Sequence, residues 1–254
     1  MKLARYEHGG SIRYGALEGE TLRPLAASPY ESLALADEPP VALADVRLLT
    51  PVTPGKMLAV GFNYRDHAIE FNKPIPTVPN IFIKPDSCLT GPDEPVLLPP
   101  CYTQRVEHES ELVVVIGKRA RFVSEADALS YVLGYTCGND VTARDMQSKD
   151  NQWSVCKGFD TFGPVGPIIE TDADPTDLDI LMRVNGEVRQ RSNTRHLIFS
   201  VAYLVHYLSH CMTLNPGDVI FTGTTSGVSP VHEGDVMEVV IPAIGTLKNP
   251  VKKG

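Results

Sequence analysis

The sequence predicts an α+β fold that is mostly β, with a mixed or mostly-β roll preceded by a small N-terminal α+β domain. Many short apolar segments are separated by Gly and Pro, which is typical of strands joined by turns. Only two segments after residue 50 have good helical spacing, which favours a roll over a doubly wound α/β sheet. A length of 254 residues is enough for one large domain with a small appendage.

Residues 1–50 are expected to form the small N-terminal domain, and residues 51–254 the larger one. Short strands should alternate with glycine turns over residues 1–25. Residues 30–37 are predicted to form a helix, because two prolines follow shortly afterwards and would end it. Residues 48–54, which contain two prolines, then have the character of a linker.

Strands and two helices are expected in the larger domain. Seven segments have the composition of strands: residues 57–62, 80–84, 110–116, 134–139, 178–184, 218–222 and 236–241. Residues 124–131 begin with a Ser N-cap and an acidic first turn, which predicts a helix. Residues 194–212 are predicted to form the longest helix, since their apolar side chains recur at helical spacing.

The composition argues against several classes of protein. A formal net charge of −8 and a pI near 5.4 speak against a nucleic-acid partner, which would require a clustered basic face. No apolar run approaches the ~18 residues of a membrane span, and the N-terminus lacks a secretory signal. The five cysteines are widely spaced without a Cys-x-x-Cys pair. This pattern is typical of reduced thiols and predicts a cytoplasmic location.

Three glutamates alternate at the start of an apolar strand. In an extended segment Glu107, Glu109 and Glu111 would share one face, where their carboxylates repel one another unless a cation binds them. A hard divalent ion with oxygen ligands is the natural choice, but a solvated acidic face is an equally good interpretation of the spacing. Asp140, after the strand expected at 134–139, could complete a Mg²⁺ site. An isolated aspartate there is more typical of an Asx turn.

A histidine and a glutamate follow the strand expected at 57–62. On a short helix His67 and Glu70 would share a face and hydrogen-bond, which is the usual arrangement of a general base that acts on water. An isolated pair at this spacing is more often a surface contact. Residues 223–227 are rich in small side chains but lack the Lys of a phosphate-binding loop.

Five segments, taken in order, resemble the fumarylacetoacetate hydrolase family over residues 55–254. They are Gly-x-Asn-Tyr-x-x-His-x-x-Glu at 61–70, His-Glu-x-Glu-Leu-x-Val-Val-Ile-Gly at 108–117, Gly-x-x-x-x-Asn-Asp at 134–140, Lys-Gly-Phe-Asp-Thr-Phe-Gly-Pro at 157–164 and Thr-Gly-Thr at 222–224. The resemblance implies a β-roll of mixed sheets behind a small N-terminal domain, in a chain that usually forms homodimers.

The resemblance also implies a role for each candidate residue and leaves Glu107 outside the metal's ligands. It implies that the metal ion, Mg²⁺ or Mn²⁺, is bound by Glu109, Glu111 and Asp140, and that water is activated by His67 and Glu70. Lys157 would stabilise enolate or oxyanion charge, and the substrate would be contacted by Arg144, Gln147 and Thr224. Arg144 and Gln147 would share a face if they lie on a helix.

One position departs from the pattern of fumarylacetoacetate hydrolase itself, which carries a further aspartate ligand where this chain has Val60. The chain therefore resembles the smaller members that act as acylpyruvate hydrolases, oxaloacetate decarboxylases or 2-hydroxyhepta-2,4-diene-1,7-dioate isomerases. The favoured hypothesis is Mg²⁺-dependent hydrolysis of a carbon–carbon bond in a small 2-oxo or 2,4-dioxo acid, with water activated by His67. Decarboxylation or isomerisation at the same site is the alternative.

A non-catalytic cation-binding protein on the same fold is disfavoured. Such a protein would have no use for His67, Glu70 and Lys157 beside the carboxylates. Substrate specificity is expected to depend on a proline-rich flap at residues 70–80 and on the loop at 223–232.

Overall fold

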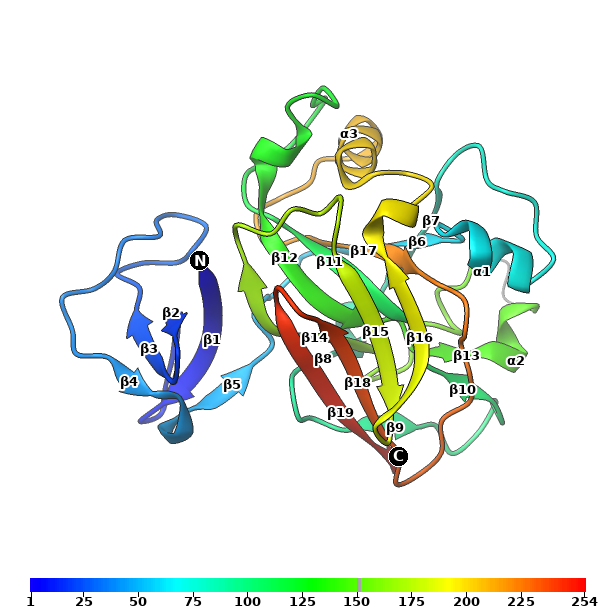
Figure 1. Cartoon of the computed structure of the whole chain (residues 1–254), viewed down its shortest axis with the longest axis horizontal. Coiled ribbons are helices and arrows are strands. Elements are labelled where there is room, and N and C mark those ends of the chain that lie inside the picture. Colours follow the sequence, from blue (N-terminus) through cyan, green and yellow to red (C-terminus); the bar gives the residue numbers. More distant parts are fainter. Residues whose placement is uncertain (150–151) are drawn as a thin grey trace.

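The computed structural model describes residues 1–149 and 152–254, and it consists mainly of strands (Figure 1). In this part of the chain the largest sheet has 12 strands, and the smaller sheets have 5 and 2. Parallel pairs occur beside antiparallel pairs. The prediction of a mostly β chain with mixed sheets is confirmed.

The 12-stranded sheet runs from the N-terminal segment through the centre of the molecule. Its described strands are β1 (Lys2–His8), β2 (Ser11–Glu18), β3 (Thr21–Pro24), β4 (Val41–Ala42), β5 (Arg47–Leu49), β6 (Met57–Gly61), β7 (Asn80–Lys84), β8 (Leu89–Thr90), β11 (Ser110–Ile116), β12 (Val132–Asn139), β14 (Gly163–Glu170) and β17 (Val219–Thr224). The order is β4-β3-β2-β1-β14-β12-β11-β17-β6-β7, with β5 paired to β1 and β8 to β14. The N-terminal strands are thus hydrogen-bonded to the rest of the sheet through β1 and β14.

The 5-stranded sheet has the order β16-β15-β18-β19-β9. Its strands are β9 (Val96–Leu98), β15 (Asp179–Val184), β16 (Glu187–Asn193), β18 (Val236–Ile241) and β19 (Gly245–Lys253). It packs against β11, β12 and β14 of the large sheet, and the hydrophobic core lies between them. A short pair, β10 (Val106–Glu107) with β13 (Thr142–Ala143), extends from the same region. The seven strands predicted for the larger domain are all present, with bounds shifted by at most 2 residues.

Strand β11 lies at the centre of this core. β12 and β17 pair with its two edges, and all 7 of its residues are buried. Its Val-Val-Val-Ile run suits a strand that is covered on both faces. A strand buried in this way holds the residues at its start in fixed positions, and those residues include the predicted ligands.

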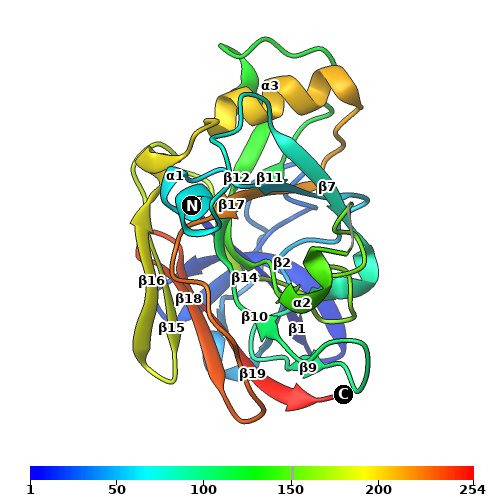
Figure 2. The ribbon, with the colours of Figure 1, turned by 90° about the vertical axis from the view of Figure 1, so that its right-hand side faces the viewer.

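Helices are few and short in the described residues. The α-helices are α1 (Arg65–Glu70), α2 (Arg144–Gln147) and α3 (Val201–Cys211), and the 3-10 helices are η1 (Leu43–Asp45), η2 (Asp86–Cys88), η3 (Ala128–Tyr131) and η4 (Thr194–His196). In Figure 2, α1 and α2 lie toward the viewer and α3 crosses the top of the molecule. None of the described helices has the length and apolar character that a membrane span requires.

The long helix predicted at 194–212 is wrong in its first third. The structure has η4, then an extended stretch, then α3. The Asn63 side chain donates to Phe199 O (3.1 Å) and accepts from Phe199 N (2.8 Å), which holds this stretch extended. Ser200 then caps α3 by accepting from Tyr203 N at 3.1 Å.

Two other predicted helices are also wrong. Only η3 forms within 124–131, since Ser124 Oγ accepts from Asp127 N (3.2 Å) and the side chains of this segment favour turns. Residues 30–37 form no helix, because Leu35 pairs with Leu25 in an extended bridge beside β3. Tertiary pairing overrides local propensity there. The N-terminal segment therefore contains strands and η1, and its expected α-helix is absent from the described structure.

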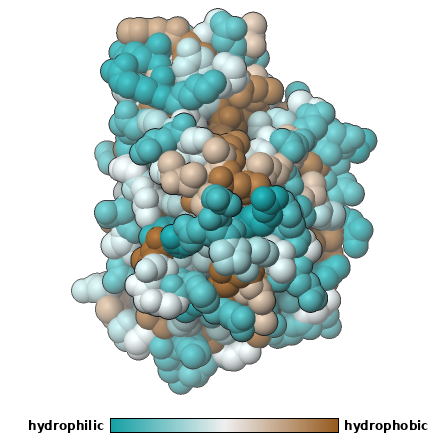
Figure 3. All heavy atoms as spheres, turned by 90° about the vertical axis from the view of Figure 1, so that its left-hand side faces the viewer, coloured by the Kyte–Doolittle hydropathy of each residue, from teal (hydrophilic) through white to brown (hydrophobic). Residues whose placement is uncertain are grey.

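The N-terminal strands lie on one side of the molecule (Figure 1). Figure 3 shows this side with atoms as spheres: hydrophilic residues cover most of it, and a broken band of hydrophobic residues crosses it. Exposed apolar side chains in this proportion are normal for a folded protein. The predicted site residues lie elsewhere, around β11, α1 and α2.

Candidate active site

Three buried carboxylates meet where β11 begins and β12 ends. Glu109 precedes β11, Glu111 is its second residue, and Asp140 follows β12. One oxygen atom from each carboxylate lies within 4.8 Å of those of the other two, and each side chain is buried. The backbone N–H of Asp140 donates to Glu109 O at 2.9 Å, and the Asn139 side chain accepts from Glu109 N at 2.9 Å.

Two buried lysines neutralise part of this charge. Lys157 Nζ donates to Glu109 Oε2 at 2.7 Å and to Asp140 Oδ2 at 2.6 Å. Lys84, the last residue of β7, donates to Asp140 Oδ1 at 2.6 Å and to the backbone carbonyl of Lys157. Sequence reasoning identified Lys157 but missed Lys84, because nothing near Lys84 in the sequence shows that this lysine is buried.

The carboxylates differ in their electrostatic surroundings. Burial raises the pKa of Glu109, but Lys157 and Arg144 outweigh it and hold that pKa well below its usual range. Burial, followed by the charges of Asp140 and Glu109, raises the pKa of Glu111 well above its usual value. A buried carboxylate beside two others is costly unless a cation compensates it.

The donor set therefore fits a divalent metal ion. Glu111 Oε2 accepts from the backbone N–H of Gly223 at 2.6 Å, which is a weaker compensation than the ammonium groups give Glu109 and Asp140. Three carboxylates on rigid strand ends supply the hard oxygen ligands that Mg²⁺ and Mn²⁺ prefer.

Glu107 does not join the carboxylate cluster. The expected face of three glutamates on one strand is wrong, because the extended segment is broken between β10 and β11. Glu107 is buried and accepts from Arg144 Nε and Arg105 Nε, each at 2.6 Å. Arg144 also donates to Gln147 Oε1 at 2.7 Å and to Glu109. Arg144 and Gln147 both lie on α2 and share a face, as expected, and Glu107 orients this arginine.

The predicted histidine pair forms on α1. His67 Nδ1 lies 3.0 Å from Glu70 Oε2, and His67 is buried. The Phe62 ring stacks on the imidazole with centroids 5.5 Å apart, and the Phe71 ring meets it edge-on at 4.9 Å. With Nδ1–H donated to Glu70, Nε2 is left as the basic nitrogen. These contacts fix the ring in one orientation.

Gln190, a buried residue on β16 of the 5-stranded sheet, connects the start of β11 to Thr224. Gln190 Oε1 accepts from Ser110 N and lies near His108 Nδ1, each at 3.0 Å. Its Nε2 donates to Thr224 Oγ1 at 2.8 Å, and Thr224 Oγ1 donates in turn to Ser110 O at 2.9 Å. Gln190 was missed from sequence, because its partners lie 34 or more residues away.

One cavity brings the predicted residues together. It is lined by Val60, Gly61, Phe62, His67, Glu109, Asp140, Gln147, Trp153, Lys157 and Thr224. Glu111 belongs to the carboxylate cluster, Glu70 bonds to His67, and Arg144 bonds to Gln147. Every predicted site residue therefore lies in or beside this cavity, while their chemical roles stay predictions. None of the residues 70–80, which were expected to form a flap, is among the lining residues.

Trp153 forms part of the wall of this cavity, a position that the sequence did not reveal. Its indole ring meets the rings of Phe62 and Phe82 edge-on, each with centroids 5.6 Å apart. A Cβ atom at Gly61 would lie 2.3 Å from Trp153 Cζ3, so the indole can occupy this place only beside a glycine. The requirement for glycine at position 61 is therefore steric.

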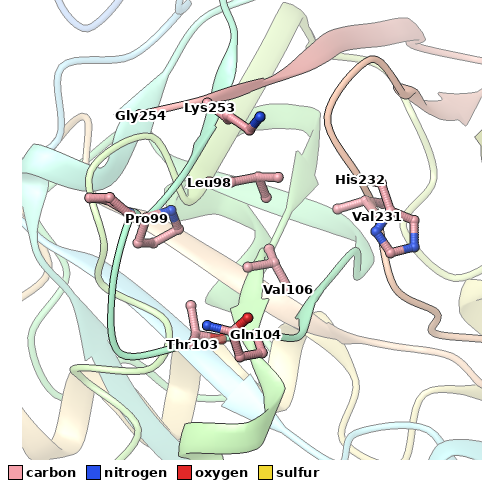
Figure 4. A pocket seen from close by; sticks show the side chains of 10 residues that line it. Leu98, Pro99, Thr103, Gln104, Val106, Val231, His232, Lys253 and Gly254 are labelled. Atoms are coloured by element: carbon pink, nitrogen blue, oxygen red, sulfur yellow. The ribbon is translucent and has the colours of Figure 1, made fainter.

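A second hollow lies away from the carboxylates, between the C-terminal end of β19 and the loop after β9 (Figure 4). Its volume is about 410 Å³, and its lining includes Leu98, Gln104, His232 and Lys253. Lys253 Nζ pairs with Glu233 at 2.9 Å. The acidic cluster found in the described residues lies elsewhere, so the carboxylate cavity is the candidate active site.

Known protein families match both parts of the chain. The family profile described as fumarylacetoacetate (FAA) hydrolase C-terminal matches residues 56–252, and a profile described as Rv2993c-like, N-terminal matches residues 1–51. A mitochondrial oxaloacetate tautomerase of Xenopus laevis is 42% identical over 82% of this chain and 69% of its own length.

Two solved structures cover 100% of both chains in the comparison. The 5-carboxymethyl-2-hydroxymuconate delta-isomerase from Mycobacterium smegmatis is 43% identical, with a TM-score of 0.93. The maleylpyruvate hydrolase from Sphingobium sp. SYK-6, in complex with manganese(II) ion and pyruvate, is 35% identical, with a TM-score of 0.83. The chain belongs to the fumarylacetoacetate hydrolase family.

Proposed function

We propose that this chain is a divalent-metal-dependent hydrolase that cleaves a carbon–carbon bond in a small 2-oxo or 2,4-dioxo acid. The observation that carries the proposal is that His67, paired with Glu70, lines the same cavity as Glu109, Asp140 and Lys157. The proposed base, two of the three proposed metal ligands and a buried cation thus line one cavity. The maleylpyruvate hydrolase relative, whose structure contains manganese(II) ion and pyruvate, supports a 2-oxo acid as ligand.

Glu109, Glu111 and Asp140 would hold the metal ion, which we propose to be Mg²⁺ with Mn²⁺ as a substitute. Such an ion supplies Lewis acidity to a substrate oxo group and neutralises charge there. Burial and its acidic neighbours raise the pKa of Glu111, which means that its ionised form is destabilised. A bound cation would compensate that charge.

His67 is the proposed base. Its Nδ1–H donates to Glu70, so Nε2 can accept a proton from a water molecule. The Glu70 carboxylate also accepts from Gly227 N at 2.9 Å, and its pKa is lowered by the bonds to His67 and Gly227, which outweigh burial. An ionised Glu70 stabilises the imidazolium that forms when His67 takes the proton.

The cationic side chains would handle the substrate's negative charge. Lys157 lies against Glu109 and Asp140, where it can stabilise the enolate that departs when the bond breaks. Arg144, held by Glu107 and Gln147, presents a planar guanidinium suited to a substrate carboxylate. Thr224 also lines the cavity, and its hydroxyl is held by Ser110 O and Gln190 Nε2.

The reaction balances with water alone. Water adds to the far carbonyl carbon, and the bond between that carbon and its neighbour breaks. The neighbouring carbon takes a proton to become the methyl or methylene group of a 2-oxo acid, and the far carbon becomes a carboxylic acid. The oxygen of the attacking water therefore ends in the new carboxyl group.

The test is product analysis in H₂¹⁸O with Mg²⁺ or Mn²⁺ on acylpyruvates, oxaloacetate and a hydroxymuconate-type diacid. Hydrolysis predicts ¹⁸O in the new carboxylic acid, and loss of about 10²–10⁴-fold in kcat for His67→Ala. An enzyme that keeps full hydrolase activity as His67→Ala would contradict the role of His67. The metal-ion requirement is checked in the same assay with EDTA.

Two relatives are named for other reactions, isomerisation and tautomerisation, and they favour a second candidate function. The Mycobacterium smegmatis isomerase and the Xenopus laevis tautomerase are 43% and 42% identical to this chain. Isomerisation, tautomerisation or decarboxylation at the same carboxylates needs no attacking water. The product assay separates them, since isomerisation leaves the mass unchanged, decarboxylation releases CO₂, and neither creates an ¹⁸O-labelled carboxyl group by bond cleavage.

A further inference from the structure

The end of β17 and the residues that follow it contact both β11 and α1, the helix that contains His67. We call residues 224–227 the 224–227 loop. On one side, Thr224 stands opposite Glu111 in the pairing of β17 with β11, and Gln190 Nε2 donates to Thr225 O at 2.8 Å. The start of the loop is therefore fixed to β11, the strand that contains Glu111 and begins directly after Glu109.

On its other side the 224–227 loop contacts α1 through Asp66. Asp66 Oδ2 accepts from Thr225 Oγ1 at 2.6 Å and from Ser226 Oγ at 3.0 Å. Asp66 Oδ1 accepts from the backbone N–H of His67 at 2.7 Å. The same carboxylate thus binds the loop and the histidine's own backbone. These hydrogen bonds lower the pKa of Asp66 against the opposing effect of burial, so it is ionised at neutral pH.

Helix α1 depends on contacts of this kind. It has only 6 residues, and its N-cap residue Tyr64 makes no side-chain capping bond. A helix this short is not stable by itself, so its place is set by tertiary contacts. Asp66 holds its first turn to the 224–227 loop, and Glu70 holds its last turn to Gly227 N.

We propose that Asp66 is a positioning residue that fixes His67 relative to the carboxylate cluster through Thr225 and Ser226. Asp66 is absent from the lining of the carboxylate cavity and lies instead in a surface hollow with Arg65 and Arg195, so it has no contact with a substrate held at the carboxylates. The 224–227 loop is then the physical link between the metal ligands and the base. This inference rests on the role proposed for His67.

The experiment compares four variants with the wild-type chain in kinetics and in amide hydrogen exchange. Asp66→Asn keeps the size of the side chain but removes its charge, and Thr225→Val with Ser226→Ala removes both hydroxyl donors. Arg65→Gln is the matched control, because it lies on the same helix and in the same hollow. Asp66→Asn combined with Thr225→Val and Ser226→Ala completes a double-mutant cycle.

We expect Asp66→Asn and the Thr225/Ser226 variant each to lower kcat by about 10- to 100-fold, because small displacements of a base are costly. KM and the dissociation constant for Mn²⁺ should change by less than about threefold, since the cavity lining is intact. The combined variant should be no worse than the single ones, because both break the same contact. Exchange of the α1 amides should accelerate in these variants and not in Arg65→Gln.

Unchanged exchange in α1 would overturn the proposal, and so would additive losses of kcat or a loss confined to KM. A wild-type chain that turns over no substrate in the panel counts against the proposed function alone. The exchange measurement and the Mn²⁺ affinity then still decide whether Asp66 holds α1 in place independently of the metal ligands.

Discussion

The Nζ atom of Lys84 lies 2.6 Å from Oδ1 of Asp140, and both side chains are almost completely buried. Lys84 also donates to the backbone carbonyl of Lys157, so one ammonium joins β7, the end of β12 and the turn that precedes β14. An ion pair enclosed in this way stabilises the fold only while both partners are present, because each alone would be an uncompensated buried charge.

The first prediction concerns this pair. Replacing Lys84→Met should lower the free energy of unfolding by about 3 to 5 kcal/mol, because Asp140 is left buried with one cation fewer. The measurement is urea denaturation followed by circular dichroism, with EDTA present so that the residue's own contribution is observed.

Lys248→Met is the matched control, since Lys248 is an exposed lysine on β19. It should change the free energy of unfolding by less than about 0.5 kcal/mol. Equal effects of the two substitutions would show that the contact between Lys84 and Asp140 contributes nothing particular to stability.

The sequence predicted β7 as a strand, but the burial of Lys84 could not be inferred from it. Ile81 and Ile83 alternate with Phe82 and Lys84, so the two pairs lie on opposite faces of the strand. In the structure Phe82 and Lys84 are buried, and Ile83 is exposed. The decisive partner, Asp140, is 56 residues away in the sequence, so no local pattern could reveal it.

Contacts within one short segment were easier to predict from the sequence than contacts between segments that lie far apart in it. The His67–Glu70 contact depends on a spacing of three residues within one helix, and it forms as expected. The choice of Glu109 and Glu111 over Glu107 depends on a break between β10 and β11 and on Arg144, which spacing alone could not show. Only the family resemblance separated these glutamates before the structure did.

The second prediction tests whether Glu109 and Glu111, but not Glu107, bind the metal ion. Glu109→Gln, Glu111→Gln and Asp140→Asn should each weaken Mn²⁺ binding by at least about 100-fold, because each removes a proposed ligand. Glu107→Gln should weaken it by less than about 10-fold, because Glu107 acts on Arg144 and not on the metal. Electron paramagnetic resonance titration of Mn²⁺ measures both.

Glu107→Gln is itself the matched control, being a buried glutamate 2 residues from Glu109 in the same segment. If it loses as much affinity as Glu109→Gln, then Glu107 is a ligand and the assignment from the structure is incorrect. Circular dichroism should confirm that each variant is folded before its affinity is interpreted.

The third prediction concerns Gly61 and Trp153. Gly61→Ala would place a Cβ atom 2.3 Å from Trp153 Cζ3, so the indole must leave its place in the cavity wall. Since the chain has 1 tryptophan, its fluorescence reports this movement directly, and emission should shift to longer wavelength. The free energy of unfolding should fall by about 1 to 3 kcal/mol, as is usual for overpacking.

A second variant separates this clash from other effects at Gly61. In a Trp153→Ala background the same Gly61→Ala change should cost less than about 1 kcal/mol, because the indole is gone. An equal cost in both backgrounds would mean that Trp153 does not explain the glycine. Thermal unfolding by circular dichroism suits both backgrounds, since it does not depend on tryptophan.

The fourth prediction follows from the cysteines. Burial raises the pKa of the Cys137 thiol to about 12, whereas Cys101 and Cys211 are exposed. Alkylation requires the thiolate, and a pKa this high leaves only about one part in 10⁴ ionised at pH 8. Iodoacetamide at pH 8 should therefore label Cys101 and Cys211 but not Cys137, as peptide mass spectrometry can show. In guanidinium chloride Cys137 should react like the others, and its rapid labelling in the native chain would contradict its burial.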